Sequence, residues 1–294
     1  MINQVKKLKY MLKILPDPIY LKIYYFFRLK KLLNIKTPKS FNEKLQWLKL
    51  NDRNPLYTVM VDKVKAKKYV ADIIGEEYII PTLGVWDSPD KIDLNQLPEQ
   101  FVLKCNHGSG DVFVCKNKAE FNFEHVKKKL RKLLKEDYYL IGREWPYKNV
   151  SRKIIAEKYM EDKNTAELCD YKFFCFNEVP KYCQVICNRS TNETIDFFDM
   201  EWNHQEFTGL SLPNKPFSNN PISIPIQFEK MKEFASILAK DIPFVRIDFY
   251  EVNGDLYFGE ITLYPAGGFG VFTPDEWNLK LGEYINLSEG GYRG

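Results

Sequence analysis

The residues best suited to chemistry lie near the end of the chain, on two segments that alternate like β-strands. Arg246 and Asp248 close the first segment, and Glu260 and Thr262 close the second. Asn253-Gly254 between them is typical of a tight hairpin turn, which needs positive φ at its centre. The hairpin predicts that Asp248 and Glu260 converge with Arg246 beside them. Such a pair suits Mg²⁺ on a polyphosphate, because Mg²⁺ takes few protein oxygens. An ordinary hairpin with a surface salt bridge is the alternative.

A second candidate element is a glycine-rich turn that follows an apolar segment. Lys104 ends that segment, the turn reads His107-Gly108-Ser109-Gly110, and the chain then returns as a strand. Glycines let backbone N–H groups approach phosphate oxygens, and Lys104 adds a point charge for the same anion. The pattern is not the strand-to-helix P-loop, because GxxxxGK[ST] is absent. A purely structural hairpin is the alternative here.

Two further segments could serve a nucleotide. The extended stretch Glu157-Lys158-Tyr159-Met160 offers backbone donors and acceptors to an adenine edge, and the Glu157 carboxylate could accept ribose hydroxyls. Lys172 is a lone charge in an otherwise apolar strand, directly before Phe173-Phe174-Cys175-Phe176. It is either a phosphate-binding group or a half-exposed strand lysine.

Composition narrows the class of protein. The chain has 294 residues with 21 Phe and 18 Tyr, enough for one large domain or two to three lobes. No apolar run of 18 residues occurs and lysines interrupt the N-terminal apolar stretches, so we expect no membrane span and no signal peptide. Nucleic-acid binding is not expected either, because the aromatic residues follow apolar helix faces rather than a basic groove.

The cysteines and histidines indicate no structural metal. The six Cys form no CxxC pairs and the chain has three His, so a zinc site is not expected. Several Cys lie in apolar strand-like runs, where we expect buried, reduced thiols. This usage predicts a cytoplasmic protein.

Hydrophobic periodicity predicts an α+β fold with helices first. Ser40 and Glu43 form a capping box for one of the helices. The expected helices are 2–15, 19–33, 40–50, 59–74, 122–137 and 227–240. The expected strands are 78–81, 101–104, 111–115, 154–160, 170–177, 179–188 and 194–199, followed by the closing hairpin. We divide the chain into a helical N-terminal lobe (1–75), a lobe with the glycine-rich turn and hinge (76–160), and a lobe with the metal hairpin (161–294).

The order of these elements resembles the ATP-grasp superfamily, whose fold holds ATP between two α+β lobes. More closely, the chain resembles the teichuronopeptide-biosynthesis (TupA-like) branch, over roughly residues 37–290. The motifs that carry this resemblance are Ser40-Phe41-Asn42-Glu43-Lys44-Leu45-Gln46-Trp47, Asp52-Arg53-Asn54-Pro55-Leu56-Tyr57, Asp62-Lys63, Lys104-Cys105-Asn106-His107-Gly108-Ser109-Gly110, Asp170-Tyr171-Lys172-Phe173-Phe174-Cys175-Phe176, and Gly259-Glu260-Ile261-Thr262 running into Pro265.

The resemblance implies cofactors and roles for the site residues. ATP and Mg²⁺ are the implied cofactors. The nucleotide would contact Lys104, the turn from His107 to Gly110, the hinge from Glu157 to Met160, and Lys172. Asp248, Glu260 and Thr262 would bind metal, and Arg246 with Lys172 would act on the reacting groups. Most ATP-grasp enzymes carry Asn where this chain has Thr262, a weaker ligand, which leaves one or two metals open.

The implied reaction activates a carboxylate as an acyl phosphate, which an amine then displaces. The branch is associated with surface-polysaccharide loci, so the expected partners are a uronic-acid-containing glycan or nucleotide sugar and an amino acid or other amine, in capsule or O-antigen biosynthesis. Gly267-Gly268-Phe269-Gly270 is a candidate acceptor loop or a plain turn. The alternatives are a glycosyltransferase that uses a nucleotide sugar, an ATP-dependent sugar kinase, and a binding protein without catalysis.

The N-terminal segment is strongly basic. Residues 1–40 hold ten Lys/Arg and one acid, Asp17, whereas the whole chain has a net charge of +4. Lysine-rich helices with Tyr and Phe could lie on an anionic membrane, which would give residues 1–36 a peripheral contact at the inner face of the plasma membrane. The alternative is that their apolar faces pack on the body of the protein.

Overall fold

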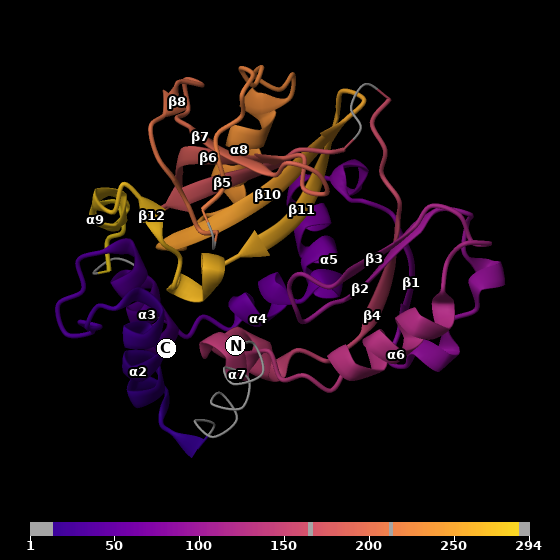
Figure 1. Cartoon of the computed structure of the whole chain (residues 1–294), viewed down its shortest axis with the longest axis horizontal. Coiled ribbons are helices and arrows are strands. Elements are labelled where there is room, and N and C mark those ends of the chain that lie inside the picture. The colour runs from indigo at the N-terminus through magenta and orange to yellow at the C-terminus, as the bar shows by residue number, and fades with distance from the viewer. Residues whose placement is uncertain (1–13, 164–166, 212–213, 288–294) are drawn as a thin grey trace.

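The structure, a computed structural model, describes residues 14–163, 167–211 and 214–287. The helix expected at 2–15 lies almost wholly outside this range. Four helices open the described chain, and Figure 1 shows them beneath and between two sheets. They are α2 (Asp17–Leu29), α3 (Phe41–Asn51), α4 (Leu56–Val61) and α5 (Lys63–Ile74). The Ser40 side chain accepts from the Glu43 backbone and the Glu43 side chain accepts from the Ser40 backbone, which confirms the capping box.

Two expected elements in this region are wrong. The single helix expected at 59–74 is broken at Asp62, whose side chain accepts from the backbone N–H of Val64 and so starts α5 anew. The strand expected at 78–81 is instead a 3₁₀ turn (Glu76–Tyr78) followed by an isolated bridge from Ile79 to Phe258. The apolar run Ile79-Ile80 resembles a strand because Ile79 is buried in the core of the large sheet, but Ile80 instead lines the cavity between the sheets and no ladder forms.

A four-stranded antiparallel sheet carries the glycine-rich turn and the hinge. Its order is β1-β4-β2-β3, and helix α6 (Phe123–Leu133) packs its buried Val126 and Leu130 into the core of this sheet. The strands are β1 (Thr82–Trp86), β2 (Phe101–Cys105), β3 (Val112–Cys115) and β4 (Ile154–Lys158). Short helices α7 (Tyr139–Gly142) and η5 (Trp145–Asn149) precede β4.

A six-stranded antiparallel sheet carries the metal hairpin, in the order β11-β10-β5-β6-β7-β8. Helix α8 (Phe228–Leu238) packs against β5, β6 and β10. The strands are β5 (Asp170–Phe176), β6 (Val179–Cys187), β7 (Thr194–Phe198), β8 (His204–Gln205), β10 (Phe244–Val252) and β11 (Asp255–Thr262). The chain ends with η6 (Pro265–Gly268), β12 (Phe272–Thr273), which pairs β9 (Thr208–Gly209), and α9 (Glu276–Glu283).

The closing hairpin is confirmed, and so is the α+β class. Asn253 and Gly254 have φ of 54° and 86°, as a primed turn requires. Helices α3 and α4 share the core of the large sheet, because buried Phe41, Leu45 and Tyr57 belong to the same cluster as its strands, whereas the buried residues of α2 form a separate cluster with Phe269. The divisions at residues 75 and 160 stay predictions. Within the described ranges, no helix is long and apolar enough to cross a membrane.

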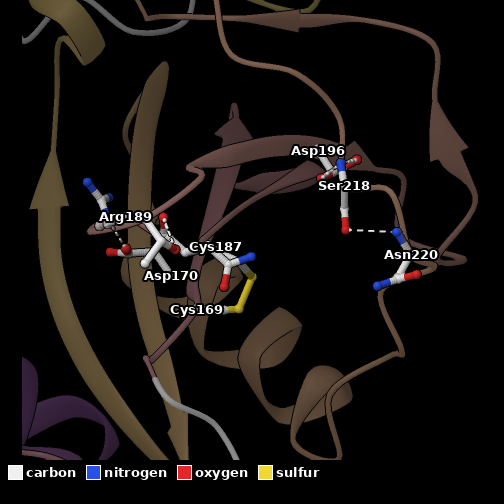
Figure 2. Close-up of a disulfide and its surroundings, with 9 residues drawn as sticks. Cys169, Asp170, Cys187, Arg189, Asp196, Ser218 and Asn220 are labelled. Atoms are coloured by element: carbon white, nitrogen blue, oxygen red, sulfur yellow. Dashed lines mark hydrogen bonds and ion pairs between the residues drawn. A yellow bond between two sulfur atoms is a disulfide. The ribbon is translucent and has the colours of Figure 1, made fainter.

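The expectation of reduced thiols is wrong for two cysteines. Cys169 and Cys187 form a disulfide, drawn in Figure 2, while Cys105, Cys115, Cys175 and Cys183 are free and buried. The physical reason is the strand register: Asp170 pairs with Ile186, which places the preceding Cys169 opposite Cys187 with their Cα atoms 4.5 Å apart.

Candidate functional site

The end of the β10–β11 hairpin gathers the charged residues that the sequence pattern singled out. Asp248 pairs with Glu260 in the strand register, and Arg246 pairs with Thr262. Arg246 donates from Nε to Asp248 Oδ1 at 2.6 Å and from Nη2 to Glu260 Oε1 at 2.9 Å. It also donates to Thr262 Oγ1 at 3.0 Å. The predicted convergence of the two carboxylates beside Arg246 is therefore what the structure shows.

A β-bulge in the hairpin sets the positions of the charged residues. The register shifts between Asp248 and Phe249, opposite Gly259. A Cβ atom at Gly259 would lie 3.0 Å from the backbone oxygen of Asp248, a contact tighter than most side chains tolerate. Glycine at this position lets β11 approach β10 closely where Glu260 must face Asp248.

Lys172 lies inside this cluster rather than at a half-exposed position. It is 5% exposed, and its Nζ contacts Asp170 Oδ1 at 3.1 Å and also an oxygen of Asp248. Arg189 contacts Asp170 from the other side at 2.6 Å, next to the disulfide (Figure 2). Cations and carboxylates thus alternate across the ends of three adjacent strands, so each buried charge has a partner of opposite sign.

These partners keep the carboxylates ionised. Burial alone would raise the pKa of Glu260, but Lys63, Arg246 and Lys172 together lower it well below its ordinary value. In the same way burial opposes ionisation of Asp170, while Lys172 and Arg189 lower its pKa. The site therefore presents fixed negative charges at neutral pH.

Lys104 projects from the small sheet and is held by Glu157. The Lys104 Nζ lies 2.5 Å from Glu157 Oε2, and Lys67 of α5 lies 2.7 Å from Glu157 Oε1. Burial would raise the pKa of Glu157, but these two lysines lower it. Since both its oxygens face lysines, the Glu157 carboxylate orients two cations, which differs from the ribose contact expected for it.

The glycine-rich turn joins the small sheet to the metal hairpin through Lys63. Lys63 Nζ donates to the Gly108 carbonyl at 2.7 Å and lies 3.6 Å from Glu260 Oε2. Gly110 has a φ of +95° and nothing within 4 Å of a Cβ position, so the turn is open to a ligand. The His107 ring is instead buried, with its nitrogens 3.3 Å from Asn106 Oδ1 and 3.2 Å from the Leu133 carbonyl.

A cavity of about 540 Å³ lies between the sheets and joins these groups. Most of the predicted nucleotide contacts line it, whereas His107 and Gly108 line a neighbouring cavity of about 250 Å³. The predicted residues that line the larger cavity are Lys104, Ser109, Gly110, Glu157, Lys158, Tyr159, Met160, Lys172, Asp248 and Glu260. A third cavity of about 290 Å³ shares Lys63, Ser109 and Glu260 with it and adds Arg246 and Thr262.

Comparison with known protein families decides what this arrangement belongs to. The family model described as TupA-like ATPgrasp matches residues 43–286, most of the chain. The chain belongs to the TupA-like ATP-grasp family. It is therefore an ATP-grasp ligase, of a superfamily that uses ATP with a divalent metal to join carboxylates to amines. The glycosyltransferase alternative from the sequence has no support in this membership.

Solved structures similar to this ligase include three other ligases. D-alanine–D-alanine ligase from Helicobacter pylori is 14% identical with a TM-score of 0.42, over 84% of this chain and 70% of that one. D-cycloserine synthetase DcsG is 15% identical with a TM-score of 0.42, over 78% and 70%. Phosphoribosylamine–glycine ligase from Thermotoga maritima is 13% identical with a TM-score of 0.43, over 72% of this chain but 49% of that one. No curated protein matches.

The carboxylates of this ATP-grasp chain fit Mg²⁺ of the kind that a nucleotide brings. Among the described residues no group of three or more His, Cys, Asp and Glu could hold a metal by itself. Two carboxylates, Asp248 and Glu260, line the large cavity together, and Thr262 adds a hydroxyl nearby. Mg²⁺ suits such a sparse oxygen set when phosphate and water supply its other ligands. Glu260 is the more accessible of the two, with a third of its side chain exposed.

Sequence reasoning missed several residues of this ATP-grasp site. Lys63 and Lys67 lie on α5, one turn apart, and their roles depend on contacts with distant strands. The Asp62-Lys63 pair was a visible family signal without an assigned role. Asp170 and Arg189 were missed because their pairing follows from the register of β5 and β6.

Proposed function

We propose that this ligase activates the carboxylate of a sugar acid, of the uronic acid class, as an acyl phosphate and joins it to an amino acid or other amine. The observation that carries the proposal is the pair of adjoining cavities, about 540 and 290 Å³, that share Lys63, Ser109 and Glu260. We name the smaller one the acceptor cavity. A phosphoryl group leaving the larger cavity at these shared residues would meet a substrate in the smaller one.

The residues around this junction can carry out the transfer by charge and position. Lys104 and Lys172 face the large cavity and would hold phosphate oxygens, with backbone N–H groups of Ser109 and Gly110 beside them. Asp248 and Glu260 would hold Mg²⁺, which would supply charge for the transferring phosphoryl group. Arg246 borders the acceptor cavity, where it would stabilise the oxyanion of the tetrahedral adduct.

The lining of the acceptor cavity supports an acidic carbohydrate. Arg28, Lys63 and Arg246 provide three cations at this cavity. Its aromatic residues offer flat apolar faces, which suit a sugar ring. They are Tyr24, Tyr138, Tyr147, Tyr264 and Phe269. Ala266 and Gly267 of η6 border the same cavity, which supports the acceptor role proposed for this loop. The acceptor is a nucleotide sugar, a lipid-linked sugar or a polymer of a capsule or O-antigen pathway.

A coupled assay tests the proposed reaction. The protein is incubated with Mg²⁺-ATP and glucuronic acid, galacturonic acid or UDP-glucuronic acid, with and without each of the standard amino acids. Phosphate release that requires both sugar acid and amine, with an amide product in the mass spectrum, is the expected result. Loss of release in Asp248→Asn ties it to the site. ADP formation without free phosphate would instead establish a sugar kinase.

We also propose a peripheral membrane contact through the described part of residues 1–36. Ile19, Phe26 and Phe27 share one face of α2 at helical spacing and are 48%, 46% and 56% exposed. Lys22 of α2, and Lys30 directly after its end with its ammonium over the Phe27 ring, add cations beside these residues, as in helices that lie on anionic lipid. Sedimentation with phosphatidylglycerol vesicles should pellet the protein and leave Phe26→Ser/Phe27→Ser in the supernatant. Equal sedimentation of both proteins would exclude this face.

A further inference from the structure

The acceptor cavity contains a buried acid, Glu144, that the proposed phosphoryl transfer does not use. Glu144 lies between α7 and η5, is 7% exposed, and lines the cavity together with Arg246 and Glu260. Within the described residues its carboxylate makes no hydrogen bond and no ion pair within 4 Å. A buried carboxylate without a partner is costly, so its presence beside a reaction site calls for a ligand.

The cation whose charge acts on Glu144, Lys49 of α3, donates its hydrogen bonds to other acceptors. An ammonium group has three donors, and those of Lys49 go to Gln46 Oε1 at 3.0 Å, to the Gly142 carbonyl at 2.7 Å and to the Gly267 carbonyl at 2.5 Å. Lys49 is 1% exposed, and its hydrogen bonds hold the backbone at Gly142 and Gly267, both of which lie beside the Glu144 carboxylate. It therefore offers Glu144 a long-range charge but no hydrogen bond.

The other ionisable groups on the wall of the acceptor cavity are Tyr24, Arg28, Lys63, Tyr138, Tyr147, Arg246, Glu260 and Tyr264. Burial raises the pKa of Glu144, and Lys49 offsets part of that effect. Burial, together with the charges of Glu144 and Glu260, raises the pKa of Tyr138 well above its ordinary value, so that phenol stays protonated and can donate. The cavity thus has one carboxylate that is a stronger base than an ordinary surface acid.

We propose that Glu144 binds the ammonium group of the amine substrate in the acceptor cavity and accepts its proton. The inference rests on the proposed ligase reaction and adds to it the amine site and its base. The shape of the cavity carries it: Glu144 and the Arg246–Glu260 end, where the acyl phosphate would form, line one space of about 290 Å³.

The proton and electron balance of this step is complete. One proton passes from the ammonium to the Glu144 carboxylate, which frees the nitrogen lone pair. The nitrogen attacks the acyl carbon, the C–N bond forms, and the bond from that carbon to the phosphate oxygen breaks. Its electron pair leaves with phosphate, which takes the second proton from nitrogen. No oxidant, reductant or further reactant is needed.

Hydroxylamine separates the two halves of the reaction. It is largely uncharged at neutral pH, so it can attack an acyl phosphate without a base and gives a hydroxamate that is measured by its iron complex. Wild type, Glu144→Gln and the matched control Glu276→Gln, an exposed acid on α9, are compared with Mg²⁺-ATP and each of glucuronic acid, galacturonic acid and UDP-glucuronic acid. Each receives either hydroxylamine or the amino acids, assayed singly.

The expected result is that Glu144→Gln keeps hydroxamate formation within about twofold and loses amide formation by about 100-fold or more, the usual contribution of a general base. Glu276→Gln should behave as wild type in both assays. Retention of amide formation in Glu144→Gln, or equal loss of both products in a folded variant, would overturn the role of Glu144. No hydroxamate from wild type with any of the three sugar acids would instead overturn the proposed function itself.

A second variant keeps the test decisive if Glu144→Gln fails to fold. Glu144→Asp retains the charge but withdraws the carboxylate by one methylene. The ratio of amide to hydroxamate should then fall relative to wild type, because hydroxylamine needs no proton acceptor. An unchanged ratio would contradict the proposal.

Discussion

Replacement of Arg246 by methionine is the most informative perturbation of the metal hairpin. Arg246 makes two hydrogen bonds to Asp248, each 2.6 Å, and one each to Glu260 and Thr262. Its loss leaves two buried or half-buried carboxylates with less opposing charge. We expect the free energy of unfolding to fall and phosphate release to decrease.

The size of the stability effect follows from the partners that remain. Removing one member of a buried ion pair costs about 3–5 kcal/mol. Asp248 keeps its contact with Lys172, and Glu260 keeps Lys63 at 3.6 Å, so the lower end, about 3 kcal/mol, applies to Arg246→Met. Arg246→Lys retains the charge without the fork that grips Asp248, and we expect it to lose about 1.5 kcal/mol, one charge-assisted hydrogen bond.

Urea unfolding in EDTA measures the loss of stability, and the same experiment in Mg²⁺ measures how much of it the metal restores. Magnesium should restore more stability to Arg246→Met than to wild type, because a divalent cation replaces the missing charge. Phosphate release should fall by about 100- to 1,000-fold in Arg246→Met, as for loss of an oxyanion donor. If Arg246→Met unfolds within about 1 kcal/mol of wild type in EDTA, the carboxylates are not held by opposing charge and our account of the hairpin is wrong.

Three further predictions concern other parts of the site. The double substitution Cys169→Ser/Cys187→Ser removes a disulfide between cysteines 18 residues apart, and the free energy of unfolding in urea should fall by about 3 kcal/mol. Wild type should show the same loss only when the disulfide is reduced. Glu260 binds its proton more weakly when folded, so its contribution to stability is full above its ordinary pKa of 4.5 and declines as the pH falls below that value. Unfolding between pH 5 and pH 3, measured at about half-unit steps, should therefore show a shallower decline for Glu260→Gln; equal slopes would refute this assignment. Lys104→Met should raise the KM for ATP by about tenfold, the loss of one charged contact, while exposed Lys91→Met should leave it unchanged.

Local chemistry made parts of the fold predictable from the sequence. The turn at Asn253-Gly254 needs only two residues that tolerate positive φ, so it also predicted which strand ends meet. The capping box of Ser40 depends on two residues three positions apart, so it was also predictable from the sequence. The break at Asp62 had a signal too, an Asp in the position of an N-cap, but the apolar pattern from Val59 to Ile74 outweighed it.

Other parts depend on contacts between distant segments. The Cys169–Cys187 disulfide requires the register of β5 against β6, which the spacing of the cysteines does not reveal. Lys67 reaches Glu157 across 90 positions of sequence, because α5 packs between the sheets (Figure 1). Glu144 lies in a stretch of short helices without clear periodicity. It receives no hydrogen bond from Lys49 because that ammonium group donates to Gln46 and to two backbone carbonyls.

Helix α2 has a consequence for how such an enzyme can change its substrate. It docks by donating from the Tyr20 hydroxyl to the Ile141 carbonyl at 3.0 Å, and it places Tyr24 and Arg28 on the wall of the acceptor cavity. These residues lie before position 43, where the match to the family model begins. Part of the wall of the acceptor cavity thus lies outside the stretch of chain that forms the two sheets. If the acceptor binds in this cavity as proposed, substitutions of Tyr24 and Arg28 should change which acceptor the enzyme prefers and leave the phosphoryl-transfer residues in place.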